Sequence, residues 1–503
     1  MRPTALGDLR RAVEAGRLPH RSVRHELRDN LIAKLRRGET LFPGIIGYDD
    51  TVIPQICNAV LSQHHFIVLG LRGQAKTRML RALVDLLDDE LPVVDGCEIN
   101  DDPLAPLCGG CRDRLREEGD ELRVAWLPRS LRFVEKLATP DVTIADMIGD
   151  IDPIKAARSG RQLSDDLTVH YGLLPRANRG IFAVNELPDL AGKIQVGLFN
   201  ILQEGDVQIK GYPVRLQLDV LMAFTANPED YTARGKIITP LKDRIGSEIR
   251  THYPQTRHDA IAITEQEAWV DRPRDPQSTT GVTVLPFVRE VVEEVAFQAR
   301  ADKKIDRRSG VSQRLPITCL ENVVSNAERR ALAAGEQPVV ARVTDVYAAL
   351  PSITGKFELE YEGELRGADQ VARDLIRAAV RHVFDGWFDG VDSGAVVEWF
   401  EMGGSLQVAD TTPAGDLLQQ IRDIQGLGEL AEHAGVKPTD PVPAMAAAVD
   451  FVLEGLYAQK KITRTDEREY RAAEPARRAV HSAEQLFDPN ASLPGSSKKK
   501  YYN

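Results

Sequence analysis

The stretch that decides the fold is FIVLGLRGQAKT, residues 66–77. Its first half, FIVLG (66–70), is a short apolar run that ends in glycine, and such a run is typical of a parallel strand buried on both faces. A helical pattern begins at once and continues over residues 76–88. A loop between a buried strand and a helix N-terminus suits phosphate, because backbone N–H groups and the helix dipole both face the anion. The sequence therefore predicts a phosphate-binding loop at residues 70–77.

This loop carries the side chains that a nucleoside triphosphate needs. Lys76 would neutralise the β- and γ-phosphates, and the Thr77 hydroxyl would hold Mg²⁺. The other residues that would line the phosphates are Gly70, Gly73, Gln74 and Ala75. Ala75 stands where such loops usually have glycine, and we expect alanine to be tolerated only if the backbone there is right-handed. The competing interpretation is an ordinary strand–helix turn that contains Lys-Thr by chance.

Two later apolar runs end in polar residues. GIFAV (180–184) is followed by Asn185 and Glu186, and DVLMAFTA (219–226) is followed by Asn227. We expect the first of these strands beside the phosphate loop, with Glu186 polarising the attacking water and Asn227 orienting it from the opposite side. Asn185 could hydrogen-bond a Mg²⁺-bound water, but it brings no negative charge where aspartate is usual, which puts metal affinity and hydrolysis rate in question. A single buried strand that ends in polar residues is common. Three such strands in this order, each followed by residues suited to phosphate chemistry, indicate a phosphate-binding site.

Strands separated by helical stretches predict an α/β domain with a parallel sheet.

Two arginines extend the site. Arg244 ends the segment LKDR (241–244) and could reach the γ-phosphate of a neighbouring subunit, where it would stabilise charge on the transferred phosphoryl group. Arg314 opens a helical stretch and could touch the phosphates from there. A single arginine is more often a solvated or salt-bridged surface residue than part of a site. The hypothesis for Arg244 and Arg314 therefore rests on their positions relative to the predicted strands.

Together these motifs resemble the MoxR and magnesium-chelatase I-subunit branch of the AAA+ ATPases over about residues 40–350. In that branch one hairpin insert precedes the Walker B motif and a second precedes sensor 1. Residues 147–180 and 205–220 resemble these two inserts. The segment FPGIIG (42–47) resembles the loop that approaches adenine, through Ile45 and Ile46.

The resemblance implies a role for each candidate residue. GLRGQAKT would be the Walker A motif and GIFAVNE the Walker B motif, with Thr77 and Asn185 toward Mg²⁺. The further roles are sensor 1 for Asn227, the arginine finger for Arg244 and sensor 2 for Arg314. The implied fold is an AAA+ P-loop core with hairpin inserts, a helical lid and helical extensions at both ends. The expected domains are an N-terminal extension (1–40), the core (41–270), the lid (271–355), a C-terminal helical region (356–490) and a flexible tail (491–503).

Members of this branch form hexameric rings and remodel or activate a partner that carries a von Willebrand A domain. The chain has no Asp-x-Ser-x-Ser motif, so such a partner would be a separate protein. We therefore expect a ring-forming motor that uses ATP and Mg²⁺. The alternatives are the ATPase subunit of a magnesium chelatase and a nucleotide-gated scaffold with little hydrolysis. A sigma-factor activator ranks below these, because no substrate loop and no helix-turn-helix is evident.

Composition limits the setting. The net charge of −11 argues against a mainly nucleic-acid-binding protein. No run of about 18 apolar residues exists, which predicts no membrane span. Five cysteines in 503 residues and an N-terminus unlike a secretory signal predict a reducing, cytoplasmic setting.

An unusual segment, residues 93–123, contains three of these cysteines. Cys108 and Cys111 form a C-x-x-C pair, and Cys97 precedes them. The pair supplies two thiolates for tetrahedral Zn²⁺, and an iron–sulfur cluster would use the same ligands. Reduced, unliganded thiols or a redox pair are equally open. A fourth ligand is not obvious: His64, His65 or Asp101 could serve only if folded close, and otherwise we expect Asp101 and Asp102 on the solvated surface.

Overall fold

The structure is a computed structural model that describes residues 2–152, 154, 168–208, 215–228, 236–272, 281–409, 412–465 and 469–473. Contacts divide the chain into two units, Met1–Val383 and Phe384–Asn503. None of the helices in the described ranges combines the length and the apolarity that crossing a bilayer requires.

A five-stranded parallel sheet forms the centre of the first unit, in the order β11-β1-β10-β7-β4. Its strands are β1 (Phe66–Leu69), β4 (Phe133–Leu137), β7 (Gly180–Asn185), β10 (Val220–Ala226) and β11 (Ser247–Arg250). Every residue of β1, β7 and β10 is buried, which explains their unbroken apolar runs. The predicted α/β class with a parallel sheet is confirmed. The 180–184 strand is not the immediate neighbour of the 66–70 strand, because β10 lies between them.

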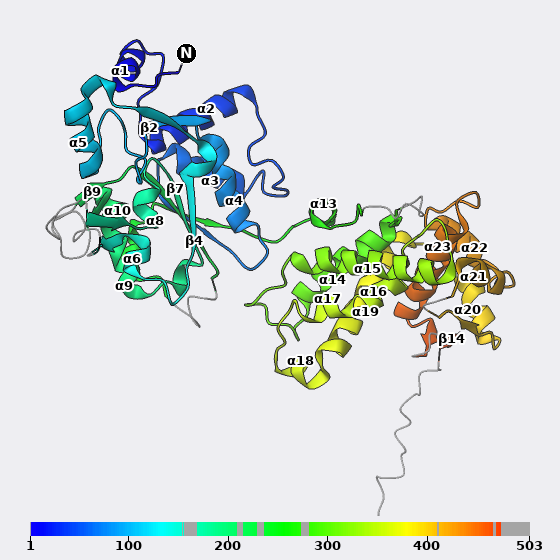
Figure 1. Cartoon of the computed structure of the whole chain (residues 1–503). Helices are drawn as coiled ribbons and strands as arrows, with labels where there is room; N and C mark the ends of the chain where they lie inside the picture. Colours follow the sequence, from blue (N-terminus) through cyan, green and yellow to red (C-terminus); the bar gives the residue numbers. More distant parts are fainter. Residues whose placement is uncertain are drawn as a thin grey trace, which may run out of the picture. The chain divides into compact units, whose positions relative to one another are not determined.

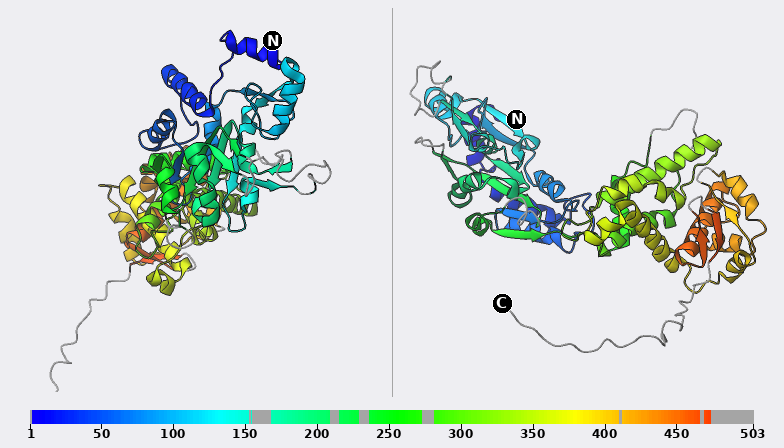
Figure 2. Two further views of the ribbon diagram at one scale, coloured as in Figure 1. Left: turned by 90° about the vertical axis from the view of Figure 1, so that its left-hand side faces the viewer. Right: turned by 90° about the horizontal axis from the view of Figure 1, so that it is seen from below.

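Helices cover both faces of this sheet, since successive side chains of a strand point to opposite faces. One set of strand residues, including Phe66 and Val68, packs with the apolar sides of α2 (Val23–Arg37), α3 (Val52–Leu61) and α4 (Lys76–Ala82). The other set, including Ile67 and Leu69, packs with α8 (Leu173–Arg176), α9 (Gly192–Gly197) and α10 (Phe199–Glu204). Figure 1 and Figure 2 show these two groups of helices on opposite sides of the sheet.

Three antiparallel hairpins interrupt the strand–helix alternation. Their strands are β2 (Glu90–Val94) with β3 (Val124–Pro128), β5 (Gly149–Ile151) with β6 (Val169–Tyr171), and β8 (Asp206–Gln208) with β9 (Arg215–Gln217). The second and third are the two predicted inserts; residues 155–167 and 209–214 between their strands lie outside the described ranges. The first pair encloses the cysteine segment and α5 (Gly109–Glu118), and α1 (Leu6–Glu14) adjoins it, because Leu6 N–H donates to Leu122 O at 2.9 Å.

The lid of the first unit is helical, as predicted. Within the predicted bounds of 271–355 it contains α14 (Pro286–Ala301), α15 (Arg314–Ala334), α16 (Thr344–Ala348) and α17 (Leu350–Thr354). The helix α13 (Arg257–Glu267) precedes these bounds, in the predicted core, and α18 (Tyr361–Arg366) and α19 (Ala368–Trp387) follow them. The apolar residues of α14 and α15 recur at helical spacing and are buried. Gly335 ends α15 in a left-handed conformation, with φ 65°.

The second unit combines helices with a small sheet. Its helices are α20 (Gly394–Glu401), α21 (Ala414–Gln420), α22 (Leu427–His433) and α23 (Val442–Ala458). Residues 414–434 form two separate helices, and Gly426, with φ 86°, is the N-cap of the second. The three-stranded sheet β12-β14-β13 (Leu406–Gln407, Glu469–Ala472, Ile462–Arg464) is not predicted by the sequence. The predicted flexible tail, 491–503, lies outside the described residues.

Candidate functional site

The phosphate-loop segment curls tightly between β1 and α4. A Cβ atom on Gly70 would lie 1.7 Å from Thr251 Oγ1, and one on Gly73 would lie 2.1 Å from Ser312 Oγ, so only glycine fits at both positions. Lys76 Nζ donates hydrogen bonds to the carbonyl oxygens of Gly70 at 2.5 Å and of Leu71 at 3.1 Å. The ammonium group therefore lies against the loop backbone, where a phosphate-binding lysine is needed.

Ala75 corrects one expectation. Its backbone is left-handed, with φ 54° and ψ 16°, whereas we expected alanine only with a right-handed backbone. The chain must turn sharply at this point, because Ala75 is the last residue before α4 begins at Lys76. An alanine in this conformation costs about 1–2 kcal/mol, which glycine would avoid. The loop therefore holds a strained residue at the position next to its lysine.

Asn185 is held at the carboxyl end of β7 by hydrogen bonds to three side chains. Thr77 Oγ1 and Thr225 Oγ1 each donate to Asn185 Oδ1 at 3.1 Å. Asn185 Nδ2 donates to Glu135 Oε1 at 2.6 Å, and Arg81 donates to both oxygens of this carboxylate at 2.8 and 3.1 Å. Thr77 and Asn185, the predicted magnesium-directing pair, thus lie together beside a carboxylate.

Glu135 is a residue that sequence reasoning missed. It lies on β4 in the segment FVEKL, which has no apolar run and no motif. The parallel pairing of β4 with β7 sets Leu137 opposite Asn185 and Glu135 opposite Ala183, and only this register brings the carboxylate to the amide. A negative charge is therefore present at the site even though Asn185 carries none.

Glu186 and Asn227 lie at the same edge of the sheet. Glu186 is half-buried and left-handed, with φ 55° and ψ 49°, and its N–H donates to Thr225 Oγ1 at 3.1 Å. Asn227 is buried and follows β10, which lies between β1 and β7. Because the carboxyl ends of parallel strands share one edge, Lys76, Glu186 and Asn227 all face this edge. The strained backbone of Glu186 is of the kind that collects at functional sites.

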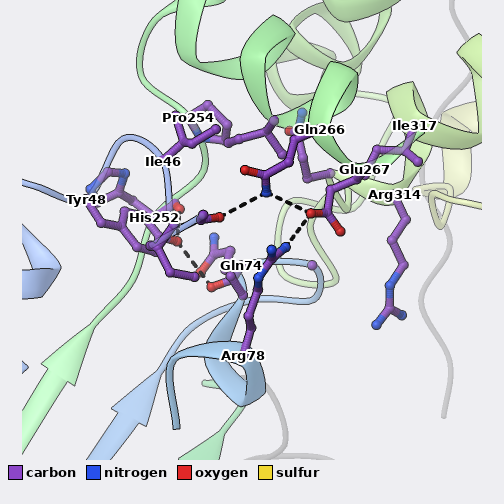
Figure 3. A pocket seen from close by; sticks show the side chains of 16 residues that line it. Ile46, Tyr48, Gln74, Arg78, His252, Pro254, Gln266, Glu267, Arg314 and Ile317 are labelled. Carbon is purple, nitrogen blue, oxygen red and sulfur yellow. Dashed lines mark hydrogen bonds and ion pairs between the residues drawn. The ribbon is translucent and has the colours of Figure 1, made fainter. Parts of the chain in front are cut away.

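A cavity of about 200 Å³ adjoins the loop (Figure 3). Its walls include the backbone of residues 73–75 and the predicted adenine-side residues Ile45 and Ile46. Ile263 and Ile317 add apolar surface from α13 and α15. Ligand pockets for whole drug-sized molecules are usually about 300–1,000 Å³, so this cavity suits part of a nucleotide, such as the base.

Polar contacts fix the walls of this cavity (Figure 3). Gln266 Nε2 donates to Gly44 O at 3.0 Å, and Arg78 forms an ion pair with Glu267. The buried Tyr48 hydroxyl donates to His252 O at 2.7 Å, and burial raises the pKa of this phenol well above its ordinary value. These contacts tie α13, α4 and the 42–48 segment into one frame.

The two candidate arginines have different places. Arg314 is the first residue of α15 and lines the cavity together with the phosphate loop. Arg244 ends α12 (Thr239–Arg244) and is not among the cavity-lining residues. It donates to Gln203 Oε1 at 3.2 Å and to Pro240 O at 2.7 Å, and its guanidinium lies 4.8 Å from the centre of the Phe199 ring. The structure therefore brings Arg314 to the loop and leaves Arg244 outside the cavity of its own chain.

Comparison with curated proteins gives consistent relatives. The chain is 28% identical over 323 residues to magnesium-chelatase subunit ChlI-2, chloroplastic, of Arabidopsis thaliana, covering 62% of this chain and 73% of that protein. It is 26% identical over 326 residues to magnesium-chelatase subunit ChlI of Nostoc sp., covering 62% and 83%. It is 30% identical over 218 residues to the ChlI homolog of Methanocaldococcus jannaschii, covering 41% and 53%. The chain is an AAA+ protein related to the magnesium-chelatase I subunits.

The other comparisons add little detail. No protein-family model matches this chain. Among solved structures, a putative ATPase from Cytophaga hutchinsonii is 16% identical with a TM-score of 0.30, covering 74% of this chain and 98% of that one. A complex between subunits BchI and BchD of magnesium chelatase includes a chain that is 21% identical with a TM-score of 0.32, covering 64% and 97%.

The AAA+ lid is coupled to the loop of the AAA+ core through Arg300. This guanidinium donates to Val311 O at 3.1 Å and to Gln313 Oε1 at 2.9 Å, and it lies 4.1 Å from the centre of the Tyr253 ring. Tyr253 in turn donates to Arg72 O at 3.0 Å. Burial lowers the pKa of Arg300 to about 10. A shift of the lid relative to the loop would therefore break a buried network.

The cysteine segment of the AAA+ core folds inward. Cys108 and Cys111 are buried and Cys97 is half-buried. Asp101 is 0% exposed, so the expectation of a solvated surface position is wrong for this residue. The reason is the tight turn from Cys97, in which Asp101 N–H donates to Cys97 Sγ at 3.4 Å. Asp102 is half-buried and pairs with His20 Nε2 at 2.7 Å.

The two histidines considered as fourth ligands are engaged elsewhere in the AAA+ core. His65 Nδ1 accepts a hydrogen bond from Met222 N–H at 3.0 Å, and burial lowers the pKa of this imidazole to about 4. His64 Nδ1 pairs with Ser247 Oγ at 2.9 Å. Asp101 is thus the candidate that the fold brings to the three cysteines.

Proposed function

We propose that this chain binds ATP with Mg²⁺, hydrolyses it, and uses the energy to remodel or activate a partner protein. The observation that carries the proposal is that the phosphate-loop segment, the Asn185–Glu135 pair, Glu186 and Asn227 share one edge of the sheet, next to a cavity that Arg314 lines. Homology supports an AAA+ ATPase of the magnesium-chelatase I-subunit kind.

In this proposal the phosphates lie in the curl of the loop. Backbone N–H groups of residues 70–77 and the Lys76 ammonium group would bind the phosphate oxygens. The base would enter the cavity beside Ile45 and Ile46, and Arg314 would contact the phosphates from the lid.

The oxygen donors around Asn185 fit a magnesium ion. Mg²⁺ prefers oxygen ligands and keeps several of its waters. Thr77 Oγ1 would be a direct ligand, Asn185 Oδ1 would hydrogen-bond a bound water, and Glu135 would supply negative charge. When bound, the ion would neutralise charge on the phosphates.

Hydrolysis would then need a base and a means to orient the water. Glu186 would accept the proton of the attacking water, and Asn227 would orient that water. The Arg244 side chain lies outside the cavity of its own chain, which fits a finger that acts on the site of the next subunit. An arginine supplied in this way raises the rate by stabilising the charge of the transition state.

This arrangement favours a homo-oligomeric ring, hexameric as the resemblance implies. The client would be a separate protein with a von Willebrand A domain, and nucleic acid is not expected as a partner. All five cysteines lie in the described part of the chain and none is in a disulfide, which supports the cytoplasmic setting.

Phosphate release and nucleotide binding test the proposal. The Glu186→Gln chain should bind ATP, release no phosphate and remain in an assembled ring. Arg244→Ala and Lys76→Ala chains should each be inactive alone, and mixing them should restore part of the activity, because some interfaces then combine an intact loop with an intact finger. Arg116→Ala is the control, since its exposed side chain pairs with Asp113 at the surface of α5. If the mixture stays inactive while each variant assembles, Arg244 does not act on a neighbour.

Two other functions have specific support. The names of the curated relatives favour the ATPase subunit of a magnesium chelatase. Insertion of magnesium into a porphyrin with added partner subunits would establish that role. Asn185 and the strained Ala75 favour a scaffold that binds ATP without turning it over. A wild-type chain that binds ATP but releases no phosphate, together with an active Asn185→Asp chain, would establish the scaffold.

A further inference from the structure

The geometry points to a structural zinc site in the 93–123 insert, formed by Cys97, Asp101, Cys108 and Cys111. This inference is independent of the nucleotide site, because none of these four residues lines the cavity beside the phosphate loop. Three thiolates and one carboxylate would close a four-coordinate site, which is the usual form of structural zinc.

The four ligand atoms are already gathered. One ligand atom from each of the four residues lies within 4.8 Å of the other three. In a tetrahedral site with Zn–S bonds of about 2.3 Å, neighbouring sulfur atoms are about 3.8 Å apart. The side chains therefore need to move inward by only about 1 Å to bind one ion.

Two turns build the site in the manner of a zinc knuckle. In the first, Gly96 and Asn100 have positive φ of 75° and 52°, and the turn between them directs Asp101 N–H to Cys97 Sγ at 3.4 Å. In the second, Cys108 is the N-cap of α5, and its Sγ accepts a hydrogen bond from Cys111 N–H at 3.3 Å. A hydrogen bond from a backbone N–H stabilises a thiolate over a thiol, so both turns prepare sulfur ligands.

Asp101 provides the second, independent observation. This carboxylate is 0% exposed, and its Oδ2 accepts a hydrogen bond from Cys108 N–H at 2.9 Å. None of the described residues donates a hydrogen bond to Oδ1. A buried carboxylate oxygen without a partner is costly, and a bound cation would remove this cost.

The donor set favours a single zinc ion over an iron–sulfur cluster. Clusters are usually held by four thiolates that surround several iron and sulfide atoms. Here one ligand is an oxygen, and the four atoms lie close enough to share one ion. Cys108 and Cys111 are buried, which suits a closed structural site with no open coordination position.

The zinc site would hold the insert against the Walker B region. Asn100 Nδ2 donates to Arg176 O at 2.9 Å, on α8 just before β7. Asn178 Nδ2 donates to Ile99 O at 3.1 Å, and Asn178 Oδ1 accepts from Asp219 N–H at 3.0 Å at the start of β10. The turn that carries Asp101 is thus joined to the segments before two strands of the nucleotide site.

Elemental analysis of the full chain tests the inference, after purification under reducing conditions without chelator or added metal. We expect about one zinc per chain. Asp101→Asn should lower zinc affinity at least about 10-fold in competition with a chelating dye, since even residues outside the first coordination shell have effects of this size. Asp101→Cys should keep the zinc, because it completes a four-thiolate site. Cys57→Ser is the matched control and should also keep it, since Cys57 lies on α3 outside the cluster.

A measurement on the wild-type chain covers the case in which Asp101→Asn fails to fold. Zinc should protect Cys97, Cys108 and Cys111 from alkylation, and a strong chelator should remove that protection. Co²⁺ substitution should give the sulfur-to-metal absorption of three thiolates. Absence of zinc, iron with acid-labile sulfide in its place, or unchanged zinc affinity of a folded Asp101→Asn chain would each overturn the inference.

Discussion

Replacing Asn185 by aspartate is the sharpest perturbation of the candidate magnesium site. The Asn185 amide donates to Glu135 Oε1 at 2.6 Å, and Arg81 donates to both oxygens of that carboxylate. Asn185→Asp exchanges the first hydrogen bond for a contact between two carboxylates. We therefore expect the variant to be less stable than wild type when magnesium is removed and to recover when magnesium is added, because the ion would lie beside both acids.

The magnitude follows from the distance. Two unit charges 4 Å apart interact by about 4 kcal/mol at an effective dielectric constant of about 20. The Arg81 side chain is 63% exposed, so its charge is screened and offsets only part of the repulsion. We expect the variant to be about 2–3 kcal/mol less stable at pH 8 without magnesium, which lowers the melting temperature by roughly 2–4 °C.

Thermal unfolding of the full chain measures this effect, first with a chelator and then with excess Mg²⁺. The matched control is the double variant Asn185→Asp/Glu135→Gln, which moves the carboxylate to the other strand and keeps one acid and one amide. Its stability without magnesium should lie within about 1 kcal/mol of wild type, since the hydrogen bond can form in the reverse direction.

The reasoning is refuted if Asn185→Asp in chelator melts with the wild-type chain, or if the double variant is no more stable than the single one. Either result would mean that Glu135 does not face position 185. The site would then lack the carboxylate that the structure supplies.

Three further predictions concern stability. Ala75→Gly should stabilise the chain by up to about 1 kcal/mol in urea unfolding, because glycine avoids a left-handed strain of about 1–2 kcal/mol at some entropic cost; a loss of stability would contradict the conformation at Ala75. The bidentate pair of Arg132 with Glu26, at 2.7 and 2.6 Å, is 1% and 2% exposed. Arg132→Leu should therefore cost about 3–5 kcal/mol by leaving a buried charge alone, and Glu26→Leu in addition should recover most of it; a cost below about 1 kcal/mol would show that the pair is not buried in solution. Burial raises the pKa of the Glu293 carboxyl from its ordinary 4.5 to about 7. Protonation of this carboxyl therefore contributes its full stabilisation of the folded chain below pH 4.5, and this contribution is lost as the pH rises to 7. Glu293→Gln should then stabilise the chain by about 2–3 kcal/mol at pH 8 and change little at pH 4.5, and an equal effect at both pH values would contradict the shift.

Much of the core could be predicted because its strands are buried on both faces. Continuous apolar runs mark β1, β7 and β10, and the phosphate-loop segment follows directly from the glycine and lysine spacing after the first of them. The helical lid was predictable for a similar reason, since α14 and α15 bury one regular stripe. The local sequence pattern was therefore sufficient to predict an element whose burial is constant, or repeats regularly, along its length.

The rest depends on contacts between distant segments. Glu135 reaches Asn185 only through the register of two strands that are about 50 residues apart, as their hydrogen bond shows. The local sequence predicts Asp101 at the surface, but the five-residue turn from Cys97 to Asp101 places this residue against Cys97. The left-handed Ala75 breaks the usual preference of its residue type, which sequence reasoning follows. The local sequence does not predict the strand order either, because β10 lies between β1 and β7 in the sheet although it follows both in the chain.

The most direct test of the nucleotide site is a titration of ATP with Mg²⁺ against the full chain and its Lys76→Ala variant, with Lys437→Ala as a control of equal charge change in the second unit. We expect wild type and the control to bind alike and Lys76→Ala to lose at least about 100-fold in affinity, because charge-assisted hydrogen bonds to phosphate are worth about 3 kcal/mol. A folded Lys76→Ala chain that binds ATP with wild-type affinity would contradict the site at the phosphate-loop segment.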